Sequence, residues 1–289
     1  MKSAIIFGAS GQDGYLLNNI LINNKVTTHL VSRNNSPIKG DVSNFDFVSQ
    51  LIKNIKPEYI FHFAATSNIN HEFLFENHLS ISSGTINILE SVKKHSRESK
   101  VFIAGSAEQF ENNGEAINEL TPFKANSSYS AERIYSTHIS RYFREKYNLQ
   151  VYLGFFFHHD SPFRSNNHLN QRIINFVKDL PTESKVKFRI GDYTIQKEFN
   201  YSGDIMEAVW LLINQDNIYE VVIGYGKPYP ISDWLELAFA KKNLDWKEWI
   251  ELDLEYHKPY DKLFSDPSLI KSLGWEPKLG MDGLLNLMY

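Results

Sequence analysis

Three glycines near the start of the chain are spaced to bind a phosphate group. Gly8, Gly11 and Gly14 follow an apolar run, residues 5–7, and open a segment with a helical pattern. Gly8 allows the turn at the strand end, Gly11 lets backbone approach a phosphate, and Gly14 permits close packing of helix on strand. The free N–H groups and positive dipole end of that helix favour a pyrophosphate. A dinucleotide site therefore fits this stretch better than a plain tight turn.

The residues after the second predicted strand bear on the choice of cofactor. Ser32-Arg33-Asn34 follow that strand, and no acidic residue comes before Asp41. An acidic side chain at this place binds the ribose 2′-hydroxyl of NAD, whereas an arginine accommodates the 2′-phosphate of NADP. Arg33 therefore favours NADP over NAD, although a loop arginine is more often a solvated surface charge.

Helical and strand patterns alternate along the first half of the chain. Apolar spacing predicts helices over residues 15–24, 45–55, 84–94 and 127–147. Short apolar runs between them predict strands over residues 5–7, 26–31, 59–63, 101–104 and 151–157. This alternation indicates an α/β fold with a doubly wound parallel sheet, the Rossmann arrangement.

After residue 157 the pattern loosens, and prolines interrupt it. Helices are predicted over residues 169–178, 204–214 and 231–241, with short strands over 186–190 and 221–223. We therefore predict an NADP-binding Rossmann domain over residues 1–157 and a smaller, mixed substrate-binding lobe over residues 158–289. The strand at 221–223 is a candidate to return to the main sheet.

Composition narrows the class of protein. The chain has 289 residues, 42% hydrophobic and 22% charged, with a net charge of −4, which is ordinary for a soluble globular protein. That balance gives no electrostatic footprint for nucleic acid. The absence of cysteine excludes disulfides, thiolate catalysis and thiolate metal sites. No stretch resembles a signal peptide or a membrane span, so we expect a cytoplasmic protein with no membrane partner.

A series of motifs carries a family resemblance over nearly the whole chain. The motifs are Gly8-Ala9-Ser10-Gly11-Gln12-Asp13-Gly14, Gly40-Asp41-Val42-Ser43, Phe63-Ala64-Ala65-Thr66-Ser67, Ser106-Ala107-Glu108, Ser128-Tyr129-Ser130-Ala131, Phe157-His158-His159-Asp160-Ser161-Pro162-Phe163-Arg164 and Leu273-Gly274-Trp275-Glu276-Pro277. In this order they resemble the extended short-chain dehydrogenase/reductases, and within them most closely the GDP-mannose 4,6-dehydratase family.

The resemblance implies a redox-neutral dehydration of a nucleotide hexose. A hydride leaves C4 for the cofactor, water is lost across C5 and C6, and the hydride returns to C6. Tyr129 is implied as the base for the 4-hydroxyl, Arg133 as the cation that stabilises its phenolate, Ser106 as a hydrogen-bond partner of the same sugar oxygen, and Glu108 as the acid and base at C5 and C6. Without the resemblance, Glu108 is an ordinary loop carboxylate and Tyr129 a half-buried helix aromatic.

The expected binding residues follow from the glycine turn and the same resemblance. For the NADP cofactor they are Gly8, Ser10, Gly11, Gln12, Asp13, Gly14, Arg33, Asp41, Val42, Ala64, Ala65, Ser67, Tyr129, Arg133, His159 and Arg164. For a nucleotide sugar, most readily a GDP-linked hexose, they are Ser67, Ser106, His158, Arg172 and Lys258. We expect no metal site, because the adjacent His158 and His159 point to opposite faces and no third ligand stands at a recognisable spacing.

Four positions depart from the family pattern. Arg133 replaces a lysine, Ile81 an asparagine, His158 a substrate-facing asparagine, and Lys258 an arginine. Arginine for lysine keeps the charge but is not conservative at a close-packed site. Three functions stay open at this point: a 4,6-dehydratase, a reductase or epimerase of a 4-keto-6-deoxy nucleotide sugar, and a non-catalytic nucleotide-binding relative.

The resemblance also implies a homodimer or homotetramer. Family members assemble through two long helices of each subunit, and the helices at residues 84–94 and 129–147 are the candidates here. Apolar and aromatic residues of the second helix serve either that contact or the core of the subunit; they are Ile134, Ile139, Tyr142 and Phe143.

Overall fold

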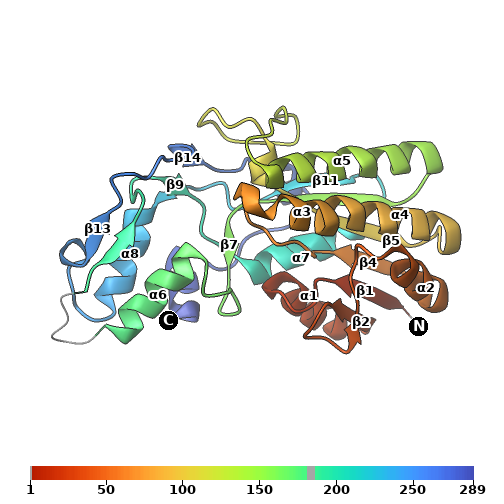
Figure 1. Ribbon diagram of the computed structural model, residues 1–289, viewed down its shortest axis with the longest axis horizontal. Coiled ribbons are helices and arrows are strands. Elements are labelled where there is room, and N and C mark those ends of the chain that lie inside the picture. The colour runs from red at the N-terminus through yellow and green to blue at the C-terminus, as the bar shows by residue number, and fades with distance from the viewer. Residues whose placement is uncertain (1, 181–185) are drawn as a thin grey trace.

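A parallel sheet forms the centre of the first lobe. The computed structural model describes residues 2–180 and 186–289. The sheet has the strand order β11-β6-β5-β4-β1-β2-β3, and neighbouring strands pair in parallel (Figure 1). Its strands are β1 (Ser3–Phe7), β2 (Thr27–Ser32), β3 (Ile38–Lys39), β4 (Tyr59–His62), β5 (Lys100–Ser106), β6 (Val151–Phe156) and β11 (Glu220–Ile223).

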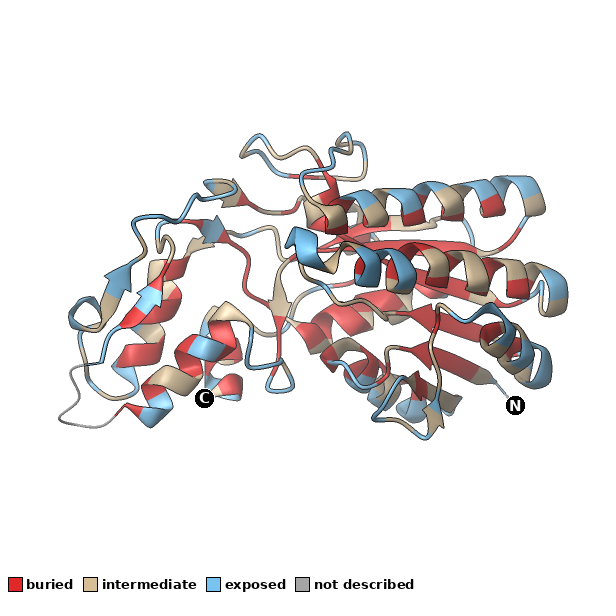
Figure 2. Cartoon of the chain, viewed as in Figure 1, coloured by how far each residue is buried: buried red, intermediate tan, exposed pale blue. Residues whose placement is uncertain are grey.

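Helices cover both faces of this sheet. On one face lie α1 (Gln12–Asn23), α7 (Ser202–Ile213) and α9 (Ser268–Ser272), and on the other α2 (Phe45–Ile55), α4 (Gly84–His95) and α5 (Ser128–Tyr147). Successive residues of a strand point to opposite faces of the sheet. Ile6 and Phe61 pack with α1 and α7, whereas Ile5 and Ile60 pack with α2 and α4. Burial on both faces explains the continuous apolar strand sequences (Figure 2).

The second lobe surrounds a separate core. Its helices are α6 (Leu169–Asp179), α8 (Ile231–Ala240) and α10 (Met281–Met288), and Trp234 of α8 stacks on Phe199 at a centroid distance of 5.1 Å. Short strands complete the lobe in three small sheets. They are β7 (His159–Asp160) with β10 (Asn200–Tyr201), β12 (Tyr229–Pro230) with β9 (Gln196–Lys197) and β14 (Lys262–Leu263), and β13 (Ile250–Leu252) with β8 (Phe188–Ile190).

The predicted fold class is confirmed, and the differences are local. Helix α1 begins at Gln12 rather than at residue 15. A helical run before α4, made of η1 (His71–Phe73), α3 (Leu74–Asn77) and the π-helical η2 (His78–Ser83), was not predicted. The side chains of Phe75 and Leu79 are exposed in it, whereas Ile81 is fully buried, so its apolar residues do not follow one regular core face. Strand β11 pairs with β6, and the domain boundary at residue 157 stays a prediction.

Candidate active site

The glycine turn between β1 and α1 has the geometry that a phosphate cradle needs. Gly8 has φ of +87°, and a Cβ there would lie 2.6 Å from the backbone nitrogen of Ala64. A Cβ on Gly14 would lie 2.6 Å from the carbonyl oxygen of Gly8. Neither position can accept a side chain, because the opposing atoms are backbone. Gly11 is the N-cap of α1 with no side-chain cap, so the first N–H groups of the helix stay free for a ligand.

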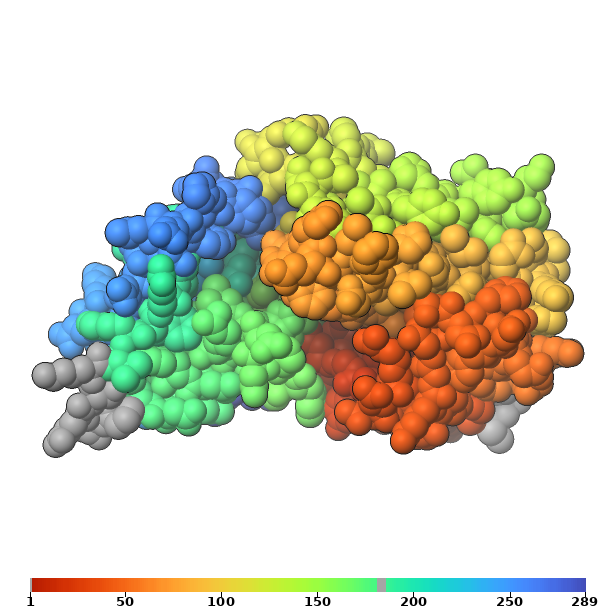
Figure 3. All heavy atoms as spheres, in the orientation of Figure 1, coloured from red at the N-terminus to blue at the C-terminus, as the bar shows by residue number. Residues whose placement is uncertain are grey.

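A pocket of about 350 Å³ opens beside this turn, at the carboxyl ends of β1, β2 and β4. The residues predicted for the cofactor that line it are Gly8, Ser10, Gly11, Arg33, Asp41, Val42, Ala64 and Ala65. Leu79 and Ser80 close it from η2. The Asp41 carboxylate accepts hydrogen bonds from the backbone nitrogen and the hydroxyl of Ser43. The space-filling view shows the surface hollowed between the two lobes, beside the segment that carries α3 and η2 (Figure 3).

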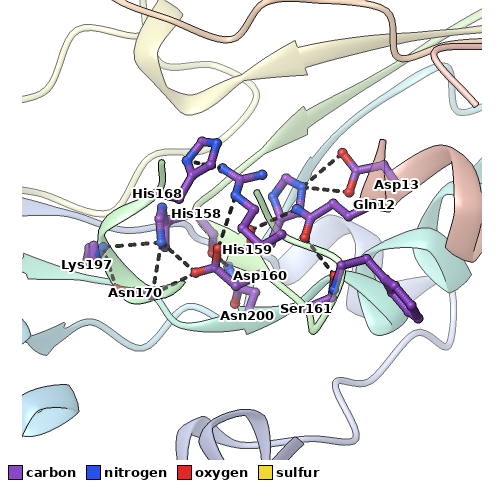
Figure 4. A network of polar contacts seen from close by, with 12 residues as sticks. Gln12, Asp13, His158, His159, Asp160, Ser161, His168, Asn170, Lys197 and Asn200 are labelled. Atoms are coloured by element: carbon purple, nitrogen blue, oxygen red, sulfur yellow. Dashed lines mark hydrogen bonds and ion pairs between the residues drawn. The ribbon is translucent and has the colours of Figure 1, made fainter. Parts of the chain in front are cut away.

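Gln12 and Asp13 do not line this pocket; they join α1 to the second lobe. The Asp13 carboxylate lies 3.1 Å from His159 Nε2, and the His159 carbonyl accepts from Gln12 Nε2 at 3.2 Å (Figure 4). Ser161 Oγ donates to Gln12 Oε1 at 2.8 Å. Burial alone would lower the pKa of the His159 imidazole, but the Asp13 carboxylate outweighs it and raises that pKa. The pKa of Asp13 is lowered, because His159 outweighs the effect of burial there.

This pair gives folding stability a predictable pH dependence. The Asp13 contribution is present above the ordinary carboxyl pKa of about 3.9, and the His159 contribution is lost as pH rises through its raised pKa, above about 6.5. Replacing His159 by glutamine should therefore lower the free energy of unfolding most between about pH 4 and pH 6.5. Urea titrations across pH 4–9 check this, and a difference that grows above pH 8 would contradict it.

The end of β5 holds the first two predicted catalytic residues in a compact turn. Ser106 is the N-cap of η3 (Ala107–Gln109), and its Oγ accepts from the backbone nitrogen of Glu108 at 3.3 Å. Gln109 Oε1 accepts from the Ser106 backbone nitrogen at 2.9 Å, and Gln109 Nε2 donates to Thr137 Oγ1 of α5 at 2.9 Å. These bonds fix the turn that carries Glu108 against helix α5.

Helix α5 carries the other two predicted catalytic residues, Tyr129 and Arg133. Ser127 caps the helix by accepting from the Ser130 backbone nitrogen at 3.1 Å. Tyr129 and Arg133, one turn apart, are both buried. Arg133 Nε donates to Tyr129 Oη at 3.2 Å, and its Nη1 donates to the Ala104 carbonyl of β5. The arginine thus keeps a cation on the phenol oxygen, where the family pattern has a lysine.

Replacing Arg133 by methionine should remove both contacts at once. We expect the free energy of unfolding to fall by about 1–3 kcal/mol, because the Ala104 carbonyl and the Tyr129 hydroxyl lose their donor, and kcat to fall about 100-fold with the cation gone. Denaturant titration and steady-state kinetics measure the two effects.

Arg133→Lys is the matched control. It keeps the charge, but one ammonium cannot reach two acceptors as the guanidinium fork does, so both losses should be smaller. Equal losses in the two variants would show that the charge on Arg133 is not what matters.

Glu108 is partly buried at the end of β5. Burial raises the pKa of Glu108 above its ordinary value, which suits a group that must both take and give a proton. Tyr260 packs against two apolar cores: the one between the sheet and helices α2, α4 and α5, and the one in the second lobe. Burial first, and then the Glu108 charge, raise the pKa of the Tyr260 phenol. The sequence carries no signal for Tyr260, because nothing local links it to β5.

A buried ionic cluster follows β6. Asp160, fully buried, contacts Arg164 Nε at 3.2 Å and His158 Nε2 at 2.9 Å. Lys197 from β9 completes the cluster, and burial lowers the pKa of its ammonium to about 8. Burial alone would raise the pKa of Asp160, but His158 and Arg164 lower it strongly. Arg164, expected at the cofactor, is thus held by Asp160 and also donates to His168 Nδ1 at 2.9 Å.

Three further expected binding residues, Ser67, Arg172 and Lys258, also lie outside the pocket. Arg172 is exposed on α6, with its guanidinium 5.2 Å above the ring of Phe188. Lys258 is half-exposed and pairs with Asp261 and Asp192. Ser67 has φ of +53° in an exposed stretch of loop. Over residues 2–180 and 186–289, no group of three or more His, Asp or Glu side chains could hold a metal ion, and no helix is long and apolar enough to cross a bilayer.

Comparison with known proteins identifies the family. Residues 5–288 match the family described as GDP-mannose 4,6 dehydratase. The chain belongs to this family. Among its relatives, GDP-mannose 4,6 dehydratase 1 of Arabidopsis thaliana is 27% identical, with 99% of this chain and 88% of the relative covered. The human GDP-mannose 4,6 dehydratase is 25% identical, with 99% and 90% covered. The match confirms the predicted family and its class of enzyme, a sugar-nucleotide dehydratase.

Solved structures with the same fold are more distant in sequence. The UDP-glucuronic acid 4-epimerase of Bacillus cereus, solved with UDP-glucuronic acid and NAD, aligns with a TM-score of 0.88 at 15% identity, covering 99% of this chain and 98% of that one. The dTDP-glucose 4,6-dehydratase of Bacillus anthracis, solved with NAD, aligns with a TM-score of 0.85 at 19% identity, covering 100% and 96%. These likenesses confirm the fold.

Proposed function

We propose that the chain is an NADP-dependent GDP-mannose 4,6-dehydratase. The observation that carries the proposal is the arrangement at the end of β5. There a buried tyrosine bound by Arg133 and a carboxyl group with a raised pKa share one edge of the sheet with the dinucleotide pocket. Family membership over residues 5–288 supports the same reaction.

The residues around the glycine turn fit a nicotinamide dinucleotide. The glycine turn, where a Cβ would collide with backbone, and the uncapped start of α1 leave room for a pyrophosphate. The small side chains of Ala64 and Ala65 leave room for an adenosine. When bound, the cofactor accepts a hydride from the sugar and returns it. Arg33, exposed in the pocket wall, supports NADP over NAD.

The protein's own groups divide the remaining work. Arg133 stabilises Tyr129 as the phenolate, and the phenolate Oη takes the proton of the sugar 4-hydroxyl to become a neutral phenol. The Ser106 hydroxyl, two residues from Glu108, orients the same sugar oxygen. Glu108 removes the C5 proton and protonates the departing 6-hydroxyl, a double task for which a raised pKa is needed.

A product assay tests the proposal. Purified protein with GDP-mannose and NADP⁺ should form a 4-keto-6-deoxy sugar nucleotide with no net change in NADPH. Stoichiometric oxidation of NADPH by a 4-keto sugar would point instead to a reductase, and inversion at one carbon to an epimerase. If cofactor binds but no nucleotide sugar reacts, the chain is a non-catalytic relative. GDP-, UDP- and dTDP-hexoses run side by side identify the base.

Replacing Arg33 by alanine should weaken NADP⁺ binding by about 10- to 100-fold. A phosphate loses one charge-assisted hydrogen-bond donor, worth about 1.5–3 kcal/mol. The affinity for NAD⁺, which has no 2′-phosphate, should stay almost constant and is the internal control. Calorimetric titration with each dinucleotide measures both. An equal loss for the two cofactors would rule out a contact with the 2′-phosphate.

We further propose that the chain is a homodimer or homotetramer built on the outer faces of α4 and α5. Of the α5 residues expected there, Phe143 and Ile139 pack into the subunit core. Tyr135 and Tyr142, by contrast, are 45% and 47% exposed and lie seven residues apart, on one side of the helix. Light scattering on the purified protein measures the assembly, and a strictly monomeric protein at micromolar concentration would refute it.

A further inference from the structure

A loop of the first lobe and a strand of the second run side by side next to the catalytic carboxyl group. Asn112 Nδ2 donates to the carbonyl oxygen of Lys262 in β14 at 2.9 Å. Ile117 continues the contact with a parallel bridge to the stretch after β14. Glu108 lies four residues before Asn112, and Tyr260 two residues before Lys262. The two side chains therefore come to the same junction of the lobes from segments far apart in the sequence.

The ring of Tyr260 fills this junction. Tyr260 lies between β13 and β14 and packs against both apolar cores that meet there. The first of these cores contains Ala107 and Phe110, on either side of Glu108 in and after η3. Of the titratable neighbours of Tyr260, Glu108 has the largest effect on the pKa of its phenol. The ring thus lies over the turn that carries the carboxyl group.

The Glu108 carboxyl group has no polar partner of its own. Over residues 2–180 and 186–289, no side chain hydrogen-bonds to it or forms an ion pair with it. Burial is the only cause that raises its pKa. The titratable groups on the elements around it have partners or solvent of their own; they are Tyr129 and Arg133 on α5, Glu111 on the following loop and Tyr256 before β14. The phenol of Tyr260 therefore acts on Glu108 through the bulk of its ring.

We propose that Tyr260 is a positioning residue whose ring covers the Glu108 carboxyl group from the second lobe and keeps water from that side of it. The inference rests on the proposed function, in which Glu108 both takes and gives a proton. The basicity of a carboxyl group with no ion pair and no hydrogen-bond donor is set by its solvation. The residue that covers it therefore decides how well it exchanges a proton near neutral pH.

The ionisation of Glu108 is measured without substrate. In protein labelled with ¹³C-glutamate, its carboxyl signal is assigned by its loss in Glu108→Gln. In Tyr260→Ala the pKa of Glu108 should fall toward its ordinary value, because water reaches the carboxyl group. Tyr260→Phe keeps the ring and should leave that pKa unchanged. If the alanine variant does not fold, Tyr260→Leu should give a smaller fall in the same direction. An unchanged pKa in the alanine or leucine variant, or a fall in Tyr260→Phe as large as theirs, would overturn the proposal.

Tyr256→Ala is the matched control. Tyr256 is 44% exposed, its ring lies against the backbone of Gly191, and Asp192 affects the pKa of its phenol more than Glu108 does. Its removal should therefore change the pKa of Glu108 less than Tyr260→Ala does, and a larger change would contradict the assignment to Tyr260. Neither tyrosine lines the dinucleotide pocket, so the affinity for NADP⁺ should be unchanged in both variants.

The consequence for turnover is measured with GDP-mannose and NADP⁺. In Tyr260→Ala the acid limb of the kcat–pH profile should move to lower pH, and kcat on the plateau should fall about 3- to 10-fold, because a less basic carboxylate takes the C5 proton less readily. Tyr260→Phe should keep the profile of the unaltered protein. Turnover with an unmoved acid limb in Tyr260→Ala would refute the role of Tyr260 alone. An unaltered protein that converts no nucleotide sugar would refute the proposed function, while the carboxyl titration would still test the cover.

Discussion

Replacing Glu108 by glutamine is expected to lower kcat for dehydration by about 10²- to 10⁴-fold, the usual range for losing a positioned general acid–base group. Glutamine keeps the size and the polar end of the side chain but cannot take the C5 proton. KM for the nucleotide sugar should change little, because the lost interaction is made in the transition state. Steady-state product formation with GDP-mannose measures both constants.

The stability of this variant is a second, independent readout. Since burial raises the pKa of Glu108, its ionised form costs folding free energy above the ordinary pKa, and that cost grows as pH rises. Glu108→Gln should therefore be at least as stable as the parent at pH 8. Glu111→Gln, on the next loop, is the matched control: Glu111 pairs with Lys124 in an exposed contact, and kcat should be unaffected. A fully active Glu108→Gln would remove the enzymatic role assigned to this residue.

Replacing Asp160 by alanine is expected to lower the free energy of unfolding by about 3–5 kcal/mol. The carboxylate is fully buried and contacts Arg164, His158 and Asn170. Removing it leaves the Arg164 and Lys197 charges buried with no opposite charge beside them, and this uncompensated burial is costlier than the loss of the contacts themselves. Urea unfolding at pH 7 measures the change.

Asp216→Ala is the same chemical change at the surface. Asp216 is 90% exposed and 3.9 Å from Lys100, so its loss should stay within about 0.5 kcal/mol. If Asp160→Ala were no more destabilising than Asp216→Ala, the buried cluster would not contribute to the stability of the fold. The Asp160 effect should also shrink as pH falls far enough to protonate the carboxylate in the unfolded chain, below about 4, because its pKa in the folded protein is lower.

Local sequence was sufficient for the architecture of the first lobe. The glycine turn, the helix over residues 45–55 and the buried strands all follow from spacing and residue type, because a parallel sheet covered on both faces demands continuous apolar strands. The motifs around Ser106, Glu108 and Tyr129 were equally visible, since each is confined to a few consecutive residues. The helical run over residues 71–83 was missed, because Phe75 and Leu79 point to solvent and so break the pattern that marks a buried face.

What the sequence by itself determined was the sheet, the phosphate-binding turn and the types of the reacting groups. Only the tertiary structure decided which side chains or backbone groups each of those groups contacts. Asp13 turns out to face His159, Arg133 spans Tyr129 and β5, and Lys197 reaches His158. The physical reason is distance along the chain: Gln12 and His159 are 147 residues apart, and no local periodicity reports a contact that forms only when β7 crosses the end of α1. The protonation of the buried groups follows from those same contacts and so could not be read before the fold was known.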